Sequence, residues 1–161
     1  MIEVVVDEVL DEGFVLPDGI DKAVLAACKV AGCSSDQMPD LCIRFASDSE
    51  VQELNNQWRC KDKVTDVLSF PMQDGPTFDM TQSLGDIALA VPFIQFEAKR
   101  LNLSQSAHAL HLIVHATLHL LGHDHINDDD ADKMQALEKQ ALLQIGLHDP
   151  YPVSTSDLET T

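Results

Sequence analysis

The sequence predicts an α+β fold, in which a small mixed four-stranded sheet packs against about five helices. Short β-branched or alternating segments occur at four places, and longer segments with apolar residues at helical spacing occur at five. Their order, β-α-β-α-β-β-α-α-α, predicts a small mixed sheet with helices packed over it. In 161 residues there is no repeat and no internal boundary, so we expect one domain over residues 1–152 and a disordered tail at 153–161.

The first half of the chain supplies two strands and two helices. Residues 2–9 alternate and are rich in β-branched side chains, which is typical of a strand, and residues 41–46 form the second strand. Residues 20–30 have the apolar spacing of a helix. The run Ser47-Asp-Ser-Glu50 is a capping box, which predicts a helix that runs to about Trp58.

Two further strands lie on either side of a loop. Residues 67–70 form a short strand that ends at Pro71. Residues 72–83 have no periodicity and are expected to be a loop, whereas residues 87–91 are an apolar strand. The proline that follows suits the first turn of a helix over residues 92–103.

Two helices complete the chain. Ser104 is expected to cap a helix that runs to Leu121, and an amphipathic helix over residues 130–145 ends at Gly146. Four aspartates near the start of the last helix suggest a second cation site, but carboxylates there also oppose the helix dipole favourably. We favour the helix start for these residues, Asp128, Asp129, Asp130 and Asp132.

The helix that begins after Ser104 carries four of the seven histidines in the chain. Plotted at 100° per residue they form one stripe, and apolar side chains cover most of the remaining circumference. Such a helix is buried on nearly every side, so the stripe must face a cleft, a metal ion or a buried network, because an unpaired buried polar group is costly. The stripe consists of His108, His111, His115 and His119.

The segment His115-Ala-Thr-Leu-His119-Leu-Leu-Gly122-His123-Asp-His125 predicts a metal site. His115 and His119 lie one turn apart on one helix face, and Gly122 suits the helix end. The chain beyond it can then return His125 toward the same point. Three imidazoles with one open position are the layout of a catalytic zinc ion, and they suit nickel as well. His123 competes with His125 for the third position.

The other two histidines of the stripe are expected to be core residues satisfied by carbonyl groups. His111 lies two turns from His119, roughly 12 Å along the helix axis, so the two side chains cannot share one ion. His108 lies still further away.

Composition bounds the class of protein and its partners. The net charge of −17 disfavours non-specific binding to nucleic acid, so a polyanionic substrate would have to be captured locally. Arg59, Lys61 and Lys63 supply three of only ten basic residues. The chain has no apolar run of membrane-spanning length, no basic signal-peptide start and no C-x-x-C pair, which together predict a cytoplasmic, reduced protein without a membrane partner.

The chemistry of the metal segment favours phosphodiester over peptide cleavage. The spacing H-x-x-x-H-x-x-G-x-x-H is that of an extended zincin helix, but those peptidases carry a glutamate general base where this chain has Ala116. A three-histidine metal can still lower the pKa of bound water to roughly 7, or polarise a phosphoryl oxygen. A guanidinium matches phosphate geometry, which gives Arg59 a concrete role.

The segment from His115 to His125 resembles the H-G-x-L-H-L-x-G-Y-D-H signature of the bacterial endoribonuclease YbeY family. The similarity extends to three further segments in the right order. These are Leu54-Asn-Asn-Gln-Trp-Arg-Cys-Lys-Asp-Lys-Val-Thr-Asp-Val-Leu-Ser-Phe-Pro71, Leu84-Gly-Asp-Ile87 and Gly146-Leu-His-Asp-Pro-Tyr151. Two departures are Ala116 in place of the usual Gly and His123 in place of the usual Tyr.

The resemblance implies a zinc-dependent endoribonuclease that acts on single-stranded RNA, in maturation of the 16S ribosomal RNA 3′ end and in ribosome quality control. It implies one α+β domain, one zinc ion held by His115, His119 and His125, a functional arginine at Arg59, and the ribosome or its small subunit as a partner. Whether a metal-bound hydroxide or the neighbouring 2′-OH attacks stays open.

Two other functions stay open at this point. One is a ribosome-associated protein with a structural zinc ion, for which His123 is the obvious fourth ligand. The other is a metallopeptidase whose carboxylate comes from elsewhere in the chain. Asp86, which follows Gly85 beside an apolar strand, either orients a ligand histidine or caps a turn.

Overall fold

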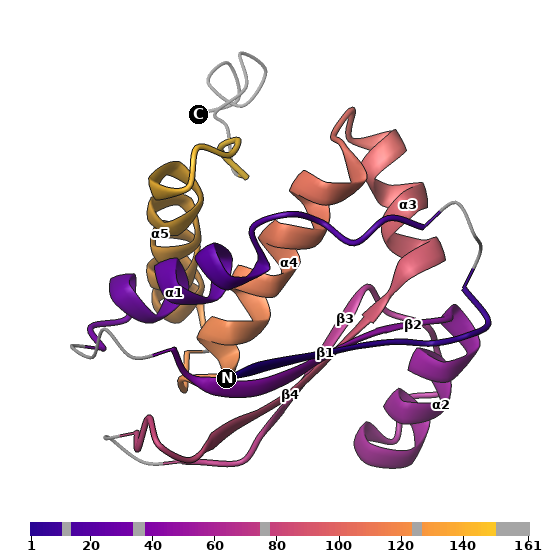
Figure 1. The fold of residues 1–161 in the computed structure, drawn as a ribbon, viewed down its shortest axis with the longest axis horizontal. Coiled ribbons are helices and arrows are strands. Elements are labelled where there is room, and N and C mark those ends of the chain that lie inside the picture. Colours follow the sequence, from indigo (N-terminus) through magenta and orange to yellow (C-terminus); the bar gives the residue numbers. More distant parts are fainter. Residues whose placement is uncertain (11–13, 34–37, 75–77, 124–126, 151–161) are drawn as a thin grey trace.

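Four strands form one mixed sheet in the part of the chain that the computed structural model describes, residues 1–10, 14–33, 38–74, 78–123 and 127–150 (Figure 1). The strand order is β1-β2-β4-β3, with β1, β2 and β4 parallel and β3 antiparallel to β4. This sheet and its five helices confirm the predicted α+β fold. The strands are β1 (Ile2–Val6), β2 (Asp40–Ala46), β3 (Val67–Pro71) and β4 (Ser83–Ala90).

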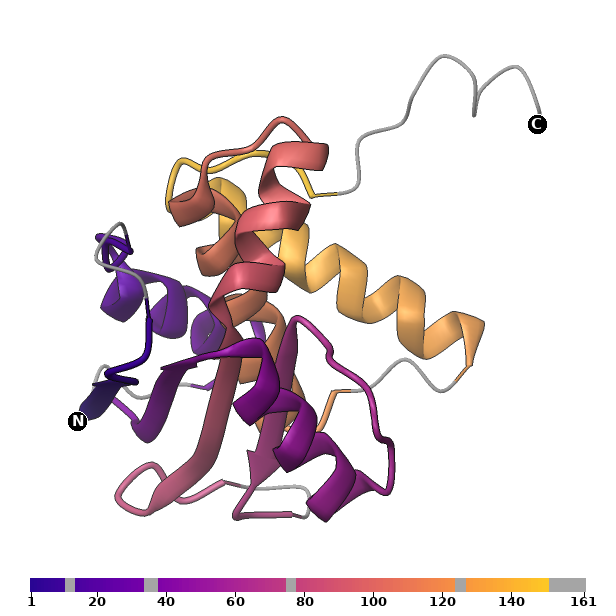
Figure 2. The ribbon, with the colours of Figure 1, turned by 90° about the vertical axis from the view of Figure 1, so that its right-hand side faces the viewer.

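The helices cover the sheet on both faces (Figures 1 and 2). They are α1 (Ile20–Val30), α2 (Asp48–Arg59), α3 (Val91–Arg100), α4 (Gln105–Leu120) and α5 (Asp128–Gln144). None of these helices is long and apolar enough to cross a membrane.

Alternation along the central strand β4 divides the interior into two cores. Ile87 and Leu89 belong to the larger core, which they share with apolar residues of α1, α4 and α5. Ala88 and Ala90 belong to the smaller core on the opposite face, which includes Val51 of α2. Because successive side chains of a strand point to opposite faces, the sheet separates α2 from α1 and α4.

Helix α4 is the central helix of the larger core, and both of its ends form as expected. The Ser104 side chain accepts a hydrogen bond from the Ala107 N–H at 3.0 Å. At the other end Gly122 takes φ +91°, and the His123 N–H donates to the Leu118 carbonyl at 3.0 Å. A residue free to adopt positive φ therefore reverses the chain directly after the paired histidines.

The structure corrects several predicted boundaries, among them the end of α3, which lies at Arg100 rather than at residue 103. Strand β1 ends at Val6, three residues before its expected end, and β4 begins at Ser83 rather than Ile87. The early start of β4 comes from pairing with β2, which places Asp40 opposite Ser83, whereas the pairing with β3 begins at Gly85. The strand expected at 87–91 ends at Ala90, because Val91 begins α3. Helix α5 begins two residues early, capped by Asn127, whose side chain accepts from the Asp130 N–H at 2.9 Å.

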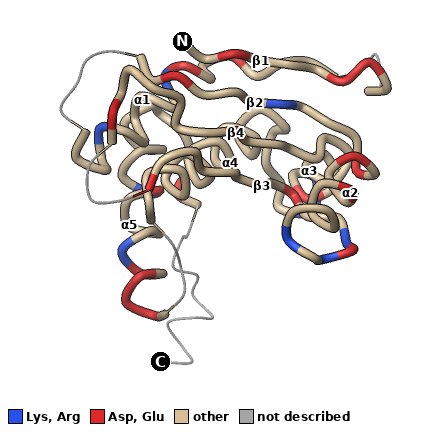
Figure 3. Tube along the Cα trace, turned by 90° about the horizontal axis from the view of Figure 1, so that it is seen from below, with Lys and Arg blue, Asp and Glu red and all other residues tan. Residues whose placement is uncertain are grey.

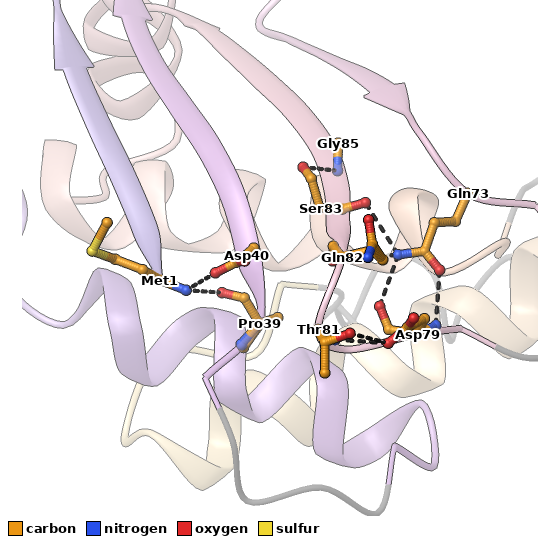
Figure 4. A network of polar contacts seen from close by, with 9 residues as sticks. All are labelled: Met1, Pro39, Asp40, Gln73, Asp79, Thr81, Gln82, Ser83 and Gly85. Atoms are coloured by element: carbon orange, nitrogen blue, oxygen red, sulfur yellow. Dashed lines mark hydrogen bonds and ion pairs between the residues drawn. The ribbon is translucent and has the colours of Figure 1, made fainter.

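The loop between β3 and β4 is closed by one glutamine, as Figure 4 shows. Gln73 donates from Nε2 to the carbonyl oxygens of Asp79 at 2.9 Å and Ser83 at 3.1 Å. Its Oε1 accepts from the Asp79 N–H at 2.8 Å. These bonds hold the two ends of the loop together.

The expected tail at 153–161 lies outside the described residues, as does the end of the expected domain after residue 150.

We expect Gly85→Ala to destabilise the fold by about 3 kcal/mol or more. Gly85 has φ +141°, and a Cβ atom there would lie 2.2 Å from the Phe70 carbonyl oxygen across the β3–β4 pair. Gly32→Ala is the matched control, because Gly32 has φ +90° with no atom near its Cβ position. The control bears backbone strain alone, about 1–2 kcal/mol. Urea unfolding followed by circular dichroism measures both, and equal losses would contradict the steric reason.

Candidate metal centre

Helix α4 brings His115 and His119 to one point. Their Nε2 atoms lie 3.1 Å apart, and their rings meet edge to face with centroids 4.6 Å apart. The four-residue spacing places both side chains on one face of the helix, one turn from each other. The predicted pairing of these two histidines is therefore present.

The separation of these two nitrogens fits a shared metal ion. A zinc ion lies about 2.0–2.1 Å from a histidine nitrogen, so a tetrahedral ion would separate two such nitrogens by roughly 3.3–3.4 Å. The 3.1 Å between the His115 and His119 Nε2 atoms is close to that value. Two imidazole nitrogens so placed suit zinc, and they suit nickel equally.

Glu138 of α5 contacts His115 at the ring nitrogen that does not face His119. Its Oε1 lies 2.9 Å from Nδ1 of His115 and 3.0 Å from Nε2 of His111, and the side chain is only 1% exposed. A proton on His115 Nδ1 donates to this carboxylate, which leaves the Nε2 lone pair for a metal. Burial raises the pKa of Glu138, but the hydrogen bonds from His111 and His115 and the positive charges of these two rings together outweigh it and lower the pKa to about 2.

Sequence reasoning missed Glu138, although its position carried a signal. It lies four residues after Met134 and four before Leu142, both of them buried, so a carboxylate interrupts the apolar stripe of an amphipathic helix. A buried carboxylate needs partners. Which partners it has depends on how α5 packs against α4.

We expect Glu138→Leu to weaken zinc binding by about 10- to 100-fold, because His115 loses the acceptor that fixes its ring and tautomer. Glu138→Gln is the matched control, since an amide oxygen of the same reach can accept the same hydrogen bond. Competition with a colorimetric chelator measures the zinc affinity of each variant. Wild-type affinity in Glu138→Leu would show that this contact does not support the metal ligand.

The remaining histidines of the stripe have carboxylate partners rather than the expected carbonyl ones. His111 pairs with Glu138, and His108 Nε2 lies 3.1 Å from Oε1 of Glu97 on α3. His108 is buried, as expected for a core histidine. His111 therefore belongs to the support of the site, because it shares the carboxylate that orients His115.

The two candidates for the third ligand position, His123 and His125, follow the end of α4 in the sequence. His125 falls in segment 124–126 and lies outside them. His123 lines the cleft beside the histidine pair, where burial, and then the charge of Lys133, lowers its pKa and favours the neutral ring. Within the described ranges no group of three His, Cys, Asp or Glu side chains is placed to hold a metal ion.

A basic cleft opens over the two histidines. It has a volume of about 510 Å³, and Arg59, Lys61 and Lys63 line it together with His115 and His119. Figure 3 shows Lys and Arg gathered at the turn that follows α2. In a chain of net charge −17, the three cations predicted to capture an anion therefore meet two of the three predicted metal ligands, His115 and His119, in one cavity.

The geometry of α2 explains how Arg59 reaches this cleft. The helix ends at Arg59, and Cys60 reverses the chain in the left-handed region at φ 57°. The Arg59 side chain donates from Nη2 to the Ser69 carbonyl of β3 at 2.5 Å, and its Cζ lies 5.8 Å from the Phe70 ring centroid. One N–H is thus used for orientation, and a guanidinium has five.

Asn55 fixes the turn that carries the two lysines. It is 2% exposed, and its Nδ2 donates to the Lys63 carbonyl at 3.0 Å. Its backbone carbonyl accepts from the Lys61 N–H at 3.2 Å. Sequence reasoning missed this residue, because one asparagine in a polar helix has no distinguishing pattern.

Asp86 does not lie at the metal centre. It lies on β4 and lines a different groove, with Trp58 and Phe70, on the α2 face of the sheet. The possibility that it orients a ligand histidine is therefore wrong for the described pair, and Glu138 occupies that place beside His115.

Comparison with known proteins identifies the relatives of this chain. A family model described as Endoribonuclease YbeY matches residues 15–146. A protein named endoribonuclease YbeY from Azorhizobium caulinodans is 39% identical over 145 residues, which cover 88% of this chain and 91% of that protein. One of the same name from Rhizorhabdus wittichii is 48% identical over 124 residues, 73% of each chain.

A solved structure shares the fold. The solution structure of TM1509 from Thermotoga maritima aligns over 94% of this chain and 99% of that one, with a TM-score of 0.54 and 20% identity. At that identity the likeness shows the α+β architecture alone.

Proposed function

We propose, from the premise that this chain belongs to the endoribonuclease YbeY family, that it is an endoribonuclease whose cleavage of single-stranded RNA depends on one zinc ion. His115 and His119 would hold the ion together with His125. The observation that carries the proposal is the basic cleft, in which Arg59 and the paired histidines line one cavity. The likeness in sequence to the family supports the choice of RNA as substrate.

Each described side chain of the cleft has a part in this reaction. Lys61 and Lys63 attract the RNA backbone against the overall negative field, and Arg59 binds the phosphate with the N–H groups that do not face Ser69. Glu138 keeps His115 in the orientation and tautomer that a metal needs. When bound, zinc supplies Lewis acidity for a phosphoryl oxygen and a lowered pKa for water.

We include a cellular role in the proposal, supported by the resemblance to the family. The substrate would be precursor 16S ribosomal RNA near its 3′ end, the partner the ribosome or its small subunit, and the compartment the cytoplasm. Ribosome quality control would use the same cleavage. Cells that lack the gene should then accumulate 16S RNA with an unprocessed 3′ end.

A peptidase is not favoured by the cleft. Ala116 lines it where a zincin peptidase carries its glutamate, and Asp66 is the one carboxylate among the described lining residues. The Asp66 Oδ1 accepts from the Val67 N–H at 2.8 Å. A structural zinc ion would need a fourth protein ligand, for which His123 stays the candidate.

The test incubates purified protein with single-stranded RNA, double-stranded RNA and casein, each with and without a zinc chelator. We expect cleavage of the single strand alone and its loss with the chelator. Cleavage of RNA that persists after complete removal of zinc would refute metal dependence. Analysis of the new ends identifies the attacking group, because a 2′,3′-cyclic phosphate forms only when the neighbouring 2′-OH attacks.

A further inference from the structure

We propose that a second groove, separated from the metal cleft by the end of α2, binds an unpaired base of the RNA strand whose phosphate lies in the cleft. This rests on the proposed function, because it takes RNA as the ligand. The groove has a volume of about 430 Å³ and lies on the α2 face of the sheet. Its aromatic and apolar lining includes Trp58, Phe70 and Met72.

The end of α2 forms a wall between the groove and the cleft. On α2, Asn55 and Arg59 line the cleft, whereas Leu54 and Trp58 line the groove. Pro71 at the end of β3 lines both cavities. An RNA strand with one phosphate beside Arg59 therefore needs to pass only this wall to place a neighbouring base in the groove.

Within this wall, the Arg59 cation packs near the aromatic ring of Phe70. The Arg59 guanidinium is anchored to Ser69 and lies 5.8 Å from the centre of the Phe70 ring, which faces the groove. The same side chain can therefore contact a phosphate on one side while it fixes the aromatic lining on the other.

The lining suits a base better than a phosphate. Trp58 is 65% exposed and Met72 is 63% exposed, and both line the same groove as Phe70, so exposed apolar surface is gathered there. The described charges of the groove balance, with Arg44 opposite in sign to Asp86, and Arg44 already bonds Glu50 at 3.0 Å. An aromatic platform stacks with any base, and the cations that bind phosphates lie in the adjoining cleft. That continuity favours RNA over a protein segment as the occupant.

Trp58 is the only tryptophan in the chain, so its fluorescence reports on the groove directly. The experiment titrates zinc-loaded protein with single-stranded 2′-O-methyl oligonucleotides of increasing length, and with a duplex of the same sequence. We expect the single strands to quench Trp58 once they are long enough to pass the wall, and the duplex to leave it unchanged, because its bases are already stacked. Single strands that bind without changing the fluorescence of Trp58 would overturn the proposal and favour a protein segment as the occupant of the groove.

Three variants separate stacking from other causes, with affinity measured by the anisotropy of a labelled oligonucleotide. Trp58→Ala should weaken binding by about tenfold, and Trp58→Phe by much less, because a phenyl ring still stacks. Phe96→Ala is the matched control, an aromatic side chain 70% exposed on α3 that lines neither cavity. Zinc content should be unchanged in all three.

The two proposals fail in different ways. Equal affinity of wild type and Trp58→Ala would refute the base-binding groove while RNA cleavage continued. A wild-type protein that neither binds nor cleaves single-stranded RNA would refute the proposed function itself.

Discussion

We expect Arg59→Ala to abolish RNA cleavage, so that its rate falls at least about 10²- to 10³-fold below that of the wild type. The zinc content should be unchanged. Arg59 lines the cleft with the histidine pair, and the contacts of its guanidinium are to Ser69 and Phe70 of β3. The variant therefore removes a phosphate-binding cation without removing a metal ligand. The measurements are single-turnover cleavage of a labelled RNA and zinc by atomic absorption.

Two further variants make this result specific. Arg59→Lys keeps the charge but loses the planar, two-pronged geometry, so its activity should lie between those of wild type and Arg59→Ala. Arg100→Ala removes an equal charge from the end of α3, outside the described cleft lining, and should cleave as the wild type does. Loss of zinc in Arg59→Ala would assign Arg59 to the structure of the metal centre instead.

Local sequence signals predicted most of the fold because the features that they detect are themselves local. Ser47 and Ser104 accept hydrogen bonds from N–H groups three residues ahead, so four consecutive residues are enough to locate each helix start. The pairing of His115 with His119 likewise needs only the helical repeat.

Several of the features that sequence reasoning missed depend on contacts between distant segments. Glu138 meets His115 across 23 residues, and only the packing of α5 against α4 brings them together. The start of β4 at Ser83 is set by pairing with Asp40 of β2, since Gly85 in isolation is a strand breaker. The groove beside Trp58 needs α2 and β3 to be neighbours, which no local pattern reveals.

We expect His119→Ala to lose the metal and His111→Ala to retain it. Both histidines lie on α4 and are half-buried there, so the two variants remove the same chemical group from similar surroundings. They differ in what the ring contacts, because His119 Nε2 lies 3.1 Å from His115 Nε2 whereas His111 Nε2 contacts the Glu138 carboxylate. Removal of a ligand opens the coordination shell, whereas removal of a supporting contact costs about tenfold in affinity.

Zinc content after dialysis and thermal stability with added zinc measure this difference without any assay of RNA cleavage. His119→Ala should keep less than about one tenth of the wild-type zinc, because two remaining imidazoles bind weakly. Zinc should raise the Tm of the wild type and of His111→Ala, since an ion that binds only the folded state stabilises it, and should leave His119→Ala unchanged. Equal loss of zinc from both variants would contradict the assignment of His119 as a ligand and His111 as a supporting residue, so the ligand assignment would have to be abandoned.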